Sequence, residues 1–165
     1  MKIGIDFDRV LFKTDEFKQH LSERFKEFEE TYPEAKENGA YYPGKHAEVM
    51  DTTISEIFDE LEKTSKFLYD DAEKLEELRN KNKVVIVSRG DQKFQEEKIR
   101  DSGVLDFVDD FHIVEERPKD TIDIDFLVDD WKKELERVDV PGFLFDRDKH
   151  SVDDIIRKVG ELDGQ

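Results

Sequence analysis

The residues of this chain that are best placed to do chemistry are carboxylates that directly follow apolar runs. Asp6 and Asp8 follow the run KIGI, and Asp129 and Asp130 end the segment IDFLVDD. Acidic pairs recur by chance in a chain this rich in Asp, so position at the end of a buried strand is what selects these four. Ligands of parallel α/β sheets bind beyond the carboxyl ends of the strands, so we expect these side chains to converge on one crevice.

Two further polar residues are expected at the same edge. Ser88 directly follows the run VVIV, and Lys119 lies shortly before the strand that leads to Asp129. Clustered carboxylates repel one another, and a hard cation such as Mg²⁺ relieves this repulsion while it keeps waters and phosphate oxygens as ligands. A carboxylate can attack phosphorus, a second carboxyl can move the proton, and a Lys and a Ser can stabilise the transferring phosphoryl group. The set therefore indicates Mg²⁺-dependent phosphoryl transfer.

The elements that must position these residues have the pattern of an α/β sheet. Short apolar runs, typical of parallel strands covered on both faces, occupy residues 2–7, 84–87, 111–114, 124–128 and 143–145. Between and after them lie helical stripes, made by Ala72, Leu75 and Leu78, by Trp131, Leu135 and Val138, and by Val152, Ile155, Ile156 and Val159 after a Ser151 N-cap. Strands that alternate with helices predict βαβ crossovers and a Rossmann-like parallel sheet with helices on both faces.

The interval of residues 10–70 breaks this rhythm. It shows no convincing strand, only one helical stripe from Phe17 to Phe28 and another from Ile54 to Leu61. Residues 38–45, NGAYYPGK, are expected to form a turn or loop, in which Tyr41 and Tyr42 either pack the loop or stack on a nucleobase. The interval is too long for a simple connection, so we expect a helical insertion over the carboxyl edge of the sheet.

Three segments together resemble the motifs of the haloacid dehalogenase-like (HAD) hydrolase superfamily, phosphatase branch. The segment IGIDFDRVLFKT resembles the first motif of that family, VVIVSRG the second, and DFLVDD the fourth, in the same order across nearly the whole chain. The insertion resembles the small helical C1 cap of the family. The resemblance implies a HAD-like core at residues 1–12 and 67–165, with a cap at residues 13–66.

The resemblance also implies roles for the residues at the motif positions. Asp6 would be the nucleophile that becomes phosphorylated, and Asp8 the general acid and base. Ser88 would bind the transferring phosphoryl group. Asp129 would bind Mg²⁺ together with Asp6 and the backbone carbonyl of Asp8, and Asp130 would support the metal site. An acid at position 8 argues against the dehalogenase branch, which lacks it.

Four basic residues depart from the family pattern, extend it or compete for one of its positions. Arg9 stands where Gly is frequent, and it is a candidate phosphate contact, as is Arg89 beside Ser88. Arg89 and Arg117 also have the simpler interpretation of solvated or paired surface residues. The third motif is met by Arg117 in the segment RPKD if the Pro is the anchor, or by Lys119, which we favour as both a catalytic and a substrate-binding residue.

Composition limits the partners. The chain has 165 residues, 44 acidic and 27 basic, with a formal net charge of −17, which disfavours broad contact with nucleic acids or anionic membranes. It has no Cys, which fits a reducing compartment, and its first residues lack an apolar signal core, so we expect a cytoplasmic protein without membrane association.

The sequence thus predicts a Mg²⁺-dependent phosphatase that acts on a small phosphorylated metabolite, as a monomer or homodimer. Within that class a nucleotide is favoured over sugar phosphates or phosphoglycolate. Two alternatives remain open: a non-catalytic HAD-like binding or scaffold protein, and a receiver-like phosphoacceptor domain. A receiver places its acidic pair after its first strand, whereas here that pair follows the fourth.

Overall fold

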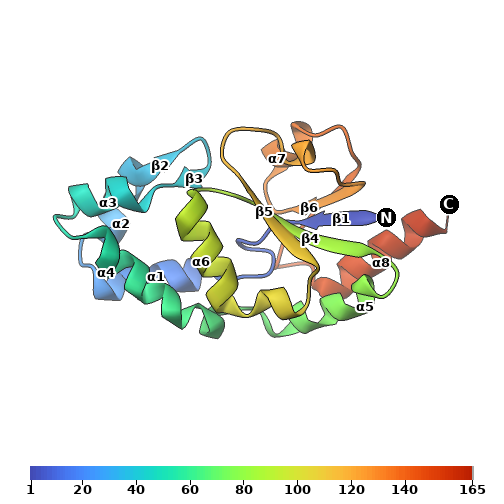
Figure 1. Ribbon diagram of the computed structural model, residues 1–165, viewed down its shortest axis with the longest axis horizontal. Coiled ribbons are helices and arrows are strands. Elements are labelled where there is room, and N and C mark those ends of the chain that lie inside the picture. The colour runs from blue at the N-terminus through green and yellow to red at the C-terminus, as the bar shows by residue number, and fades with distance from the viewer. Residues whose placement is uncertain (165) are drawn as a thin grey trace.

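The centre of the fold is a parallel sheet of five strands in the order β5-β4-β1-β6-β7 (Figure 1). The computed structural model describes residues 1–164, so the last residue of the expected core, Gln165, lies outside the described residues. The strands are β1 (Lys2–Ile5), β4 (Lys83–Arg89), β5 (Asp110–Val114), β6 (Phe126–Asp129) and β7 (Gly142–Leu144). Every neighbouring pair is parallel. The predicted Rossmann-like α/β class is confirmed, and each expected strand is present with shifted ends.

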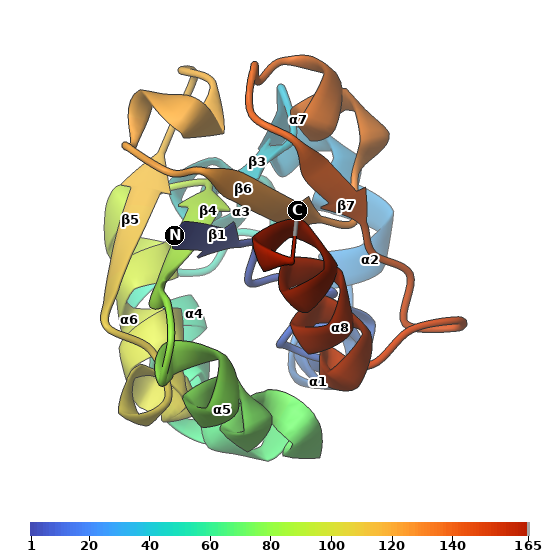
Figure 2. The same cartoon turned by 90° about the vertical axis from the view of Figure 1, so that its right-hand side faces the viewer.

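Helices cover both faces of the sheet (Figure 2). The helices outside the insertion are α5 (Leu75–Arg79), α6 (Gln92–Ser102), α7 (Lys132–Glu136) and α8 (Val152–Asp163). Successive strand residues point to opposite faces, so Val84 and Ile86 join one apolar cluster while Val85 and Val87 join another. The first cluster includes residues of α5, α6 and α8, and the second is packed by Leu135 of α7.

Two of the expected helices differ in detail from the sequence stripes. Ser151 caps α8 with a capping box, in which its side chain and that of Asp154 each accept from the other's backbone, as the N-cap prediction required. The stripe of Trp131, Leu135 and Val138 is wrong as one helix, because α7 ends at Glu136 and Trp131 is its N-cap. Pro141 and the apolar residues before it instead lead the chain back to β7.

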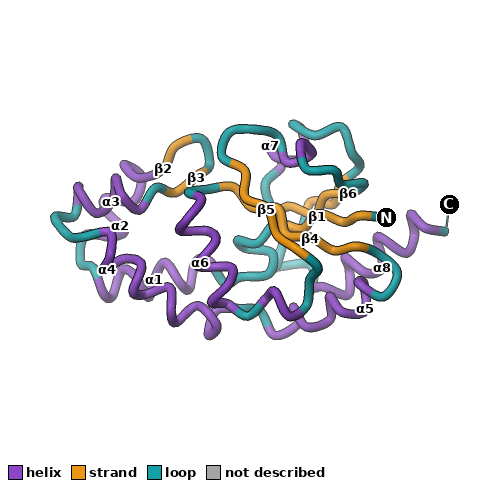
Figure 3. Tube along the Cα trace, viewed as in Figure 1, coloured by secondary structure: helices purple, strands orange, loops and turns teal. Residues whose placement is uncertain are grey.

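The insertion is mostly helical (Figure 3). Its elements are α1 (Thr14–Arg24), α2 (Phe28–Thr31), β2 (Lys36–Glu37), β3 (Ala40–Tyr41), α3 (Pro43–Val49) and α4 (Ile54–Asp59). The turn expected within residues 38–45 is present at its start, but β3 and the first turn of α3 occupy most of the rest of that segment. The expectation of no strand in the interval is wrong. Asn38 and Gly39, with φ of 51° and 83°, form the turn of an antiparallel hairpin between β2 and β3, and α3 starts at Pro43.

The two points where the insertion joins the sheet are hydrogen-bonded to each other. Lys13 N donates to Phe67 O over 2.7 Å, and Tyr69 N donates to Leu11 O over 2.9 Å. Arg147, after β7, binds the same place: its guanidinium donates to Val10 O, pairs with both oxygens of Asp71 and lies 3.8 Å from the centroid of the Tyr69 ring. The insertion therefore begins and ends at one fixed place on the core. Among the described helices, none is both long and apolar enough to cross a membrane.

Candidate active site

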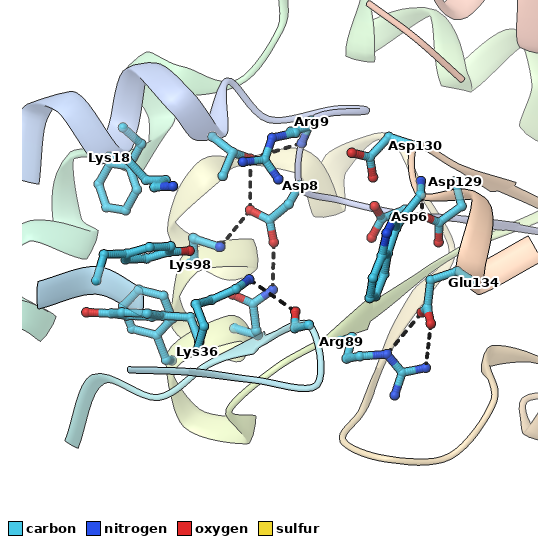
Figure 4. Close-up of a pocket in the computed structure, with 18 of the residues that line it drawn as sticks. Asp6, Asp8, Arg9, Lys18, Lys36, Arg89, Lys98, Asp129, Asp130 and Glu134 are labelled. Atoms are coloured by element: carbon cyan, nitrogen blue, oxygen red, sulfur yellow. Dashed lines mark hydrogen bonds and ion pairs between the residues drawn. The ribbon is translucent and has the colours of Figure 1, made fainter. Parts of the chain in front are cut away.

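The predicted acidic residues meet at the carboxyl edge of the sheet. Asp6 directly follows β1, where its N–H donates to Val128 O of β6 over 2.9 Å, and Asp129 is the last residue of β6. Carboxylate oxygens of Asp6, Asp129 and Asp130 lie within 4.8 Å of one another. They line a cavity of about 430 Å³ between the sheet edge and the insertion (Figure 4). Asp6, Asp129 and Asp130 are thus brought together, as the sequence predicted.

Lys119 lies at the centre of this acidic cluster. Its Nζ is 3.0 Å from Asp6 Oδ1, 2.6 Å from Asp129 Oδ2 and 3.6 Å from Glu134 Oε2. Burial lowers the pKa of Lys119, but these three carboxylates more than compensate, so its pKa is raised overall. Burial raises the pKa of Asp6 well above its usual range, and the charge of Asp129 raises it further. Of the two third-motif candidates, Lys119 is the residue in the site, while Arg117 is exposed.

Asp8 is held as a carboxylate by three side-chain donors. Lys98 Nζ lies 2.7 Å from Oδ1, Thr14 Oγ1 donates to Oδ1 over 3.0 Å, and Gln95 Nε2 donates to Oδ2 over 2.9 Å. Burial raises the pKa of Asp8, but the Lys98 charge and the hydrogen bonds outweigh it, so its pKa is lowered overall.

Sequence reasoning missed all three of these donors. Gln95 and Lys98 belong to the buried face of α6, together with Phe94, Ile99 and Ser102. A long polar side chain on an otherwise apolar helix face is costly to bury without a partner. That pattern, three residues apart on one helix, is the signal that could have found the pair.

Ser88 lies behind Gln95. Its side chain is fully buried, and its Oγ accepts from Gln95 Nε2 over 2.6 Å. Ser88 is absent from the residues that line the cavity, so the predicted contact with a phosphoryl group needs Gln95 to move.

Arg89 is bound to protein acceptors rather than free for a substrate. Its Nε and Nη2 donate to the two carboxylate oxygens of Glu134, each over 3.0 Å. The same guanidinium donates to Glu115 O over 2.7 Å and to Arg117 O over 2.9 Å. This geometry disagrees with a phosphate contact and gives Arg89 a positioning role, since it fixes the loop that carries Lys119. Glu134, which sequence reasoning also missed, is a buried acid that pairs with both Arg89 and Lys119.

The backbone at Arg9 has a conformation that favours Gly, the residue that is frequent at this position in the family that the motifs resemble. Its φ of 65° lies in the left-handed region that disfavours residues with a Cβ. Its N–H donates to Thr14 Oγ1 over 2.9 Å, and its guanidinium pairs with Asp15 over 3.0 Å at the cavity wall. The turn thus persists with Arg, and the side chain stays half-exposed.

The charges around the cavity are divided by region. The lining cations are Arg9, Lys18, Lys36, Arg89, Lys98 and Lys119, and the lining acids are Asp6, Asp8, Asp129, Asp130 and Glu134. Four of these acids come from the sheet edge and the loops that follow it, and Glu134 comes from α7. Lys18 and Lys36 come instead from α1 and β2 of the insertion. Tyr41 packs the insertion, with its hydroxyl 2.7 Å from His46 Nδ1 and its ring stacked on Tyr32. Tyr42 does not line the cavity.

The tip of the β2–β3 hairpin contacts the core beside the acidic pair. A Cβ placed on Gly39 would lie 2.7 Å from Cζ3 of Trp131, so the backbone there approaches the indole as closely as only Gly permits. Trp131 follows Asp130, and the backbone N–H of Trp131 donates to Asp129 Oδ1 over 3.0 Å. The insertion is therefore in direct contact with the segment that carries the acidic residues.

Comparison with known proteins shows which solved structures have a similar fold. No family model matches the sequence, and no curated protein is significantly similar to it. A haloacid dehalogenase-like family hydrolase from Xanthomonas campestris has a TM-score of 0.69 at 15% identity, over 100% of this chain and 92% of that one. A putative beta-phosphoglucomutase from Thermotoga maritima has a TM-score of 0.51 at 13% identity, over 98% and 99%. An L-2-haloacid dehalogenase from Xanthobacter autotrophicus has a TM-score of 0.51 at 12% identity, over 77% and 68%.

Proposed function

From the haloacid dehalogenase-like fold of this chain, we propose that the protein is a Mg²⁺-dependent phosphatase. Its substrate would be a small soluble phosphomonoester, and the reaction would pass through an aspartyl-phosphate on Asp6. The similar structures include proteins named for different reactions, a dehalogenase and a putative phosphomutase, so the fold alone does not choose the chemistry.

One observation carries the proposal. The carboxylates of Asp6, Asp129 and Asp130 share one corner of the cavity, with Lys119 Nζ between Asp6 and Asp129, while Asp8 faces the same cavity two residues after Asp6. The set provides a nucleophile, a proton carrier and a cation-binding group. Buried charge that is only partly balanced, in a cavity, is typical of a functional site, and this supports phosphoryl transfer here.

The donor set fits Mg²⁺. Hard divalent cations prefer carboxylate oxygens and usually bind through a few of them, and the oxygens of Asp6, Asp129 and Asp130 lie close enough to share one ion. Burial raises the pKa of Asp6, and the charges of Asp129 and Asp130 raise it further, so a bound cation would relieve the repulsion among the three carboxylates. These three residues would hold the ion, with the backbone carbonyl of Asp8 as the further predicted ligand. The bound ion would neutralise charge on the phosphoryl oxygens.

The steps of the reaction use the side chains of the chain itself. A carboxylate oxygen of Asp6 attacks phosphorus, and the bond from phosphorus to the leaving oxygen breaks as that oxygen takes a proton from Asp8. Asp8, now a carboxylate, removes a proton from water. The water oxygen attacks phosphorus, the bond to Asp6 breaks, and inorganic phosphate leaves. Lys119 stabilises the charge on the transferring group in both steps.

The donors around Asp8 bear on its two roles differently. Lys98, Gln95 and Thr14 favour the ionised form, which is the form that activates water in the second step. The first step needs a proton on Asp8, and a doubly charged phosphate ester raises the pKa of a nearby carboxyl. Substrate binding is therefore what would prepare Asp8 as an acid.

The decisive experiment is hydrolysis of 4-nitrophenyl phosphate with and without Mg²⁺. We expect activity that chelation removes, and a loss of at least about 10³-fold in Asp6→Asn. Asp101→Asn, an exposed site on α6, is the matched control and should keep full activity. Asp8→Asn should still form the phosphoenzyme, because 4-nitrophenolate leaves without a proton, and should release one burst of product. Full activity in Asp6→Asn, or activity that survives complete metal removal, would contradict the mechanism.

The scaffold alternative is tested by trapping. Beryllium fluoride with Mg²⁺ should form a stable analogue of the phosphorylated Asp6 and raise the melting temperature of the wild type, because a ligand of the folded state alone stabilises it. Asp6→Asn should show no such rise. The cytoplasmic location and the monomeric or homodimeric state stay predictions.

A further inference from the structure

Two lysines of the insertion surround one aromatic ring in the cavity. Lys18 Nζ lies 3.9 Å from the centroid of the Tyr32 ring, and Lys36 Nζ lies 5.7 Å from it. Lys18 belongs to α1 and Lys36 begins β2, so different elements bring the two ammonium groups together. Figure 4 shows them on the side of the cavity away from Asp129, Asp130 and Glu134.

These lysines lack the acidic partners that this chain could easily supply. Within residues 1–164, Lys18 makes no ion pair with a carboxylate, and Lys36 donates only to Gly39 O, over 3.3 Å. Burial lowers the pKa of Lys18, and the charge of Arg9 lowers it further, while Asp15, Glu29 and Asp8 oppose the effect without reversing it. Burial also lowers the pKa of Lys36, where Asp8 opposes the effect but Arg9, Lys18 and Lys98 add to it. Lys18 is half-buried and Lys36 is exposed, and neighbouring cations repel both of them. A bound anion would relieve this repulsion.

The aromatic wall beside them does not offer an open face for a nucleobase. The rings of Tyr32 and Tyr41 stack, with centroids 5.2 Å apart and planes 16° apart. An ammonium 3.9 Å from the Tyr32 centroid does not fit between two stacked rings, so it covers the other face. Tyr41 in turn packs on the ring of Phe94, with centroids 5.2 Å apart. Charge, rather than a stacking surface, is what this wall presents to a ligand.

We propose that Lys18 and Lys36 bind a second anionic group of the substrate, a carboxylate or a phosphate, at the end of the cavity away from Asp6. The substrate class would then be phosphomonoesters that carry a further anion, not nucleoside monophosphates. This inference rests on the proposed phosphatase function, because it assumes that the reacting phosphate lies at Asp6. It departs from the sequence-based preference for a nucleotide, which stays a prediction.

The test uses binding to Asp6→Asn with Mg²⁺, so that turnover is not needed. Trp131 is the one Trp of the sequence and lines the cavity, so its fluorescence reports ligands directly. Matched pairs isolate the second anion: 3-phosphoglycerate against glycerol 3-phosphate for the carboxylate, and glucose 1,6-bisphosphate against glucose 6-phosphate for the phosphate. Adenosine 5′-monophosphate is the nucleotide probe. We expect the member of at least one pair that carries the second anionic group to bind about tenfold more tightly, the effect of one additional charge-assisted contact.

Variants then locate the effect. Adding Lys18→Gln together with Lys36→Gln should reduce the preference within that pair to near unity. Lys26→Gln, an exposed lysine of the same insertion outside the cavity, is the control and should keep the preference. Which pair responds identifies the second anion as a carboxylate or a phosphate.

Each remaining outcome decides against one proposal. Ratios near unity in both pairs, or a preference that survives the double substitution, would overturn the second-anion site, as would adenosine 5′-monophosphate as the tightest ligand. If the wild type hydrolyses 4-nitrophenyl phosphate while those ratios are flat, the phosphatase proposal stands and this inference fails. If the ratios behave as expected but no phosphate ester is hydrolysed, the phosphatase proposal fails and the binding site stands.

Discussion

The two ends of the cavity are built in opposite ways. At the sheet end, Asp6 and Asp129 lie on the ends of parallel strands, are buried, and share Lys119. At the insertion end, Lys18 and Lys36 come from a helix and from a strand of two residues, and they have no acidic partner in the described part of the chain. The sheet end is held by the backbone ladder and by ion pairs, whereas the insertion end is held by aromatic packing. The difference teaches that the proposed chemistry and the proposed selectivity depend on separate parts of the structure.

The largest effect is expected where the sheet end loses its shared cation. Lys119→Met keeps most of the side-chain volume but removes the ammonium group that lies among the carboxylates of Asp6, Asp129 and Glu134. We expect the free energy of unfolding to fall by about 3–5 kcal/mol, as for other broken buried ion pairs. Activity should fall at least about 10²-fold. The folded-state pKa of Asp6 is already raised and rises further in the variant, so the loss should be greater at pH 8 than at pH 5.

Urea unfolding followed by circular dichroism at both pH values measures this loss. Lys149→Met, at an exposed position, is the matched control and should unfold like the wild type. Equal stability of Lys119→Met and wild type at pH 8 would show that the sheet end does not depend on the ion pairs.

The next effect concerns Asp8, which lies between the two ends. Lys98→Met removes the charge that most strongly lowers the pKa of Asp8, so that pKa rises. A carboxylate with a lowered folded-state pKa contributes stability above its unfolded value of about 3.9, and this contribution is lost as the pH falls through the folded pKa. In the variant that loss, and the acid limb of the rate profile, should therefore move to higher pH, with kcat about tenfold lower.

The pH profile of kcat, which includes the second step where Asp8 acts as a base, and acid unfolding check this result. Lys93→Met, exposed on the same helix, should leave both curves in place. An acid limb that stays where it is in Lys98→Met would mean that another group controls it.

A smaller effect tests the contact that joins the two ends. Gly39→Ala adds a Cβ at a φ of 83° and against Trp131. Left-handed Ala alone costs about 1 kcal/mol, and the clash should add to this. In a Trp131→Ala background the clash is absent, so the two substitutions together should destabilise less than their sum, by about 0.5–3 kcal/mol. A double-mutant cycle from urea unfolding measures the coupling, and a coupling of zero would mean that hairpin and core do not touch in solution.

The smallest effect is expected at Arg9. Arg9→Gly relieves the left-handed backbone and should gain at most about 1 kcal/mol of stability. Arg9→Gln keeps the strain but loses the charge, so a matching rise of KM in both variants would assign Arg9 to substrate binding. An equal gain of stability in Arg9→Gln and in Arg9→Gly would contradict the backbone explanation.

Much of the core could be predicted from the sequence for a physical reason. Parallel strands buried on both faces leave unbroken apolar runs, so β1, β4 and β6 were visible and their carboxyl ends marked Asp6 and Asp129. The hairpin at Asn38 was missed because its strands have only two residues, although Asn-Gly is a strong turn signal. Strand length, not turn chemistry, hid it.

The partners of the site residues were harder to predict because they depend on tertiary contacts. The spacing of Gln95 and Lys98 on the apolar face of α6 marks them as buried polar residues, but their partner Asp8, like the partners of Glu134, is known only when the helices are placed beside the sheet. Arg89 shows the same limit: sequence position beside Ser88 suggested a ligand contact, while the fold directs the guanidinium to Glu134. Sequence order identifies which strand ends meet, but not which side chains are already satisfied there.

The joining of both ends of the insertion at one place has a consequence for how the chain tolerates change. Leu11 and Tyr69 are hydrogen-bonded neighbours, and Arg147 ties Val10 and Asp71 to the loop after β7. Ends that already lie side by side can be closed by a segment of almost any length, because the entropy of closure grows only slowly with loop length. A lineage could therefore exchange everything between them, and with it the compounds accepted, while the sheet kept its fold.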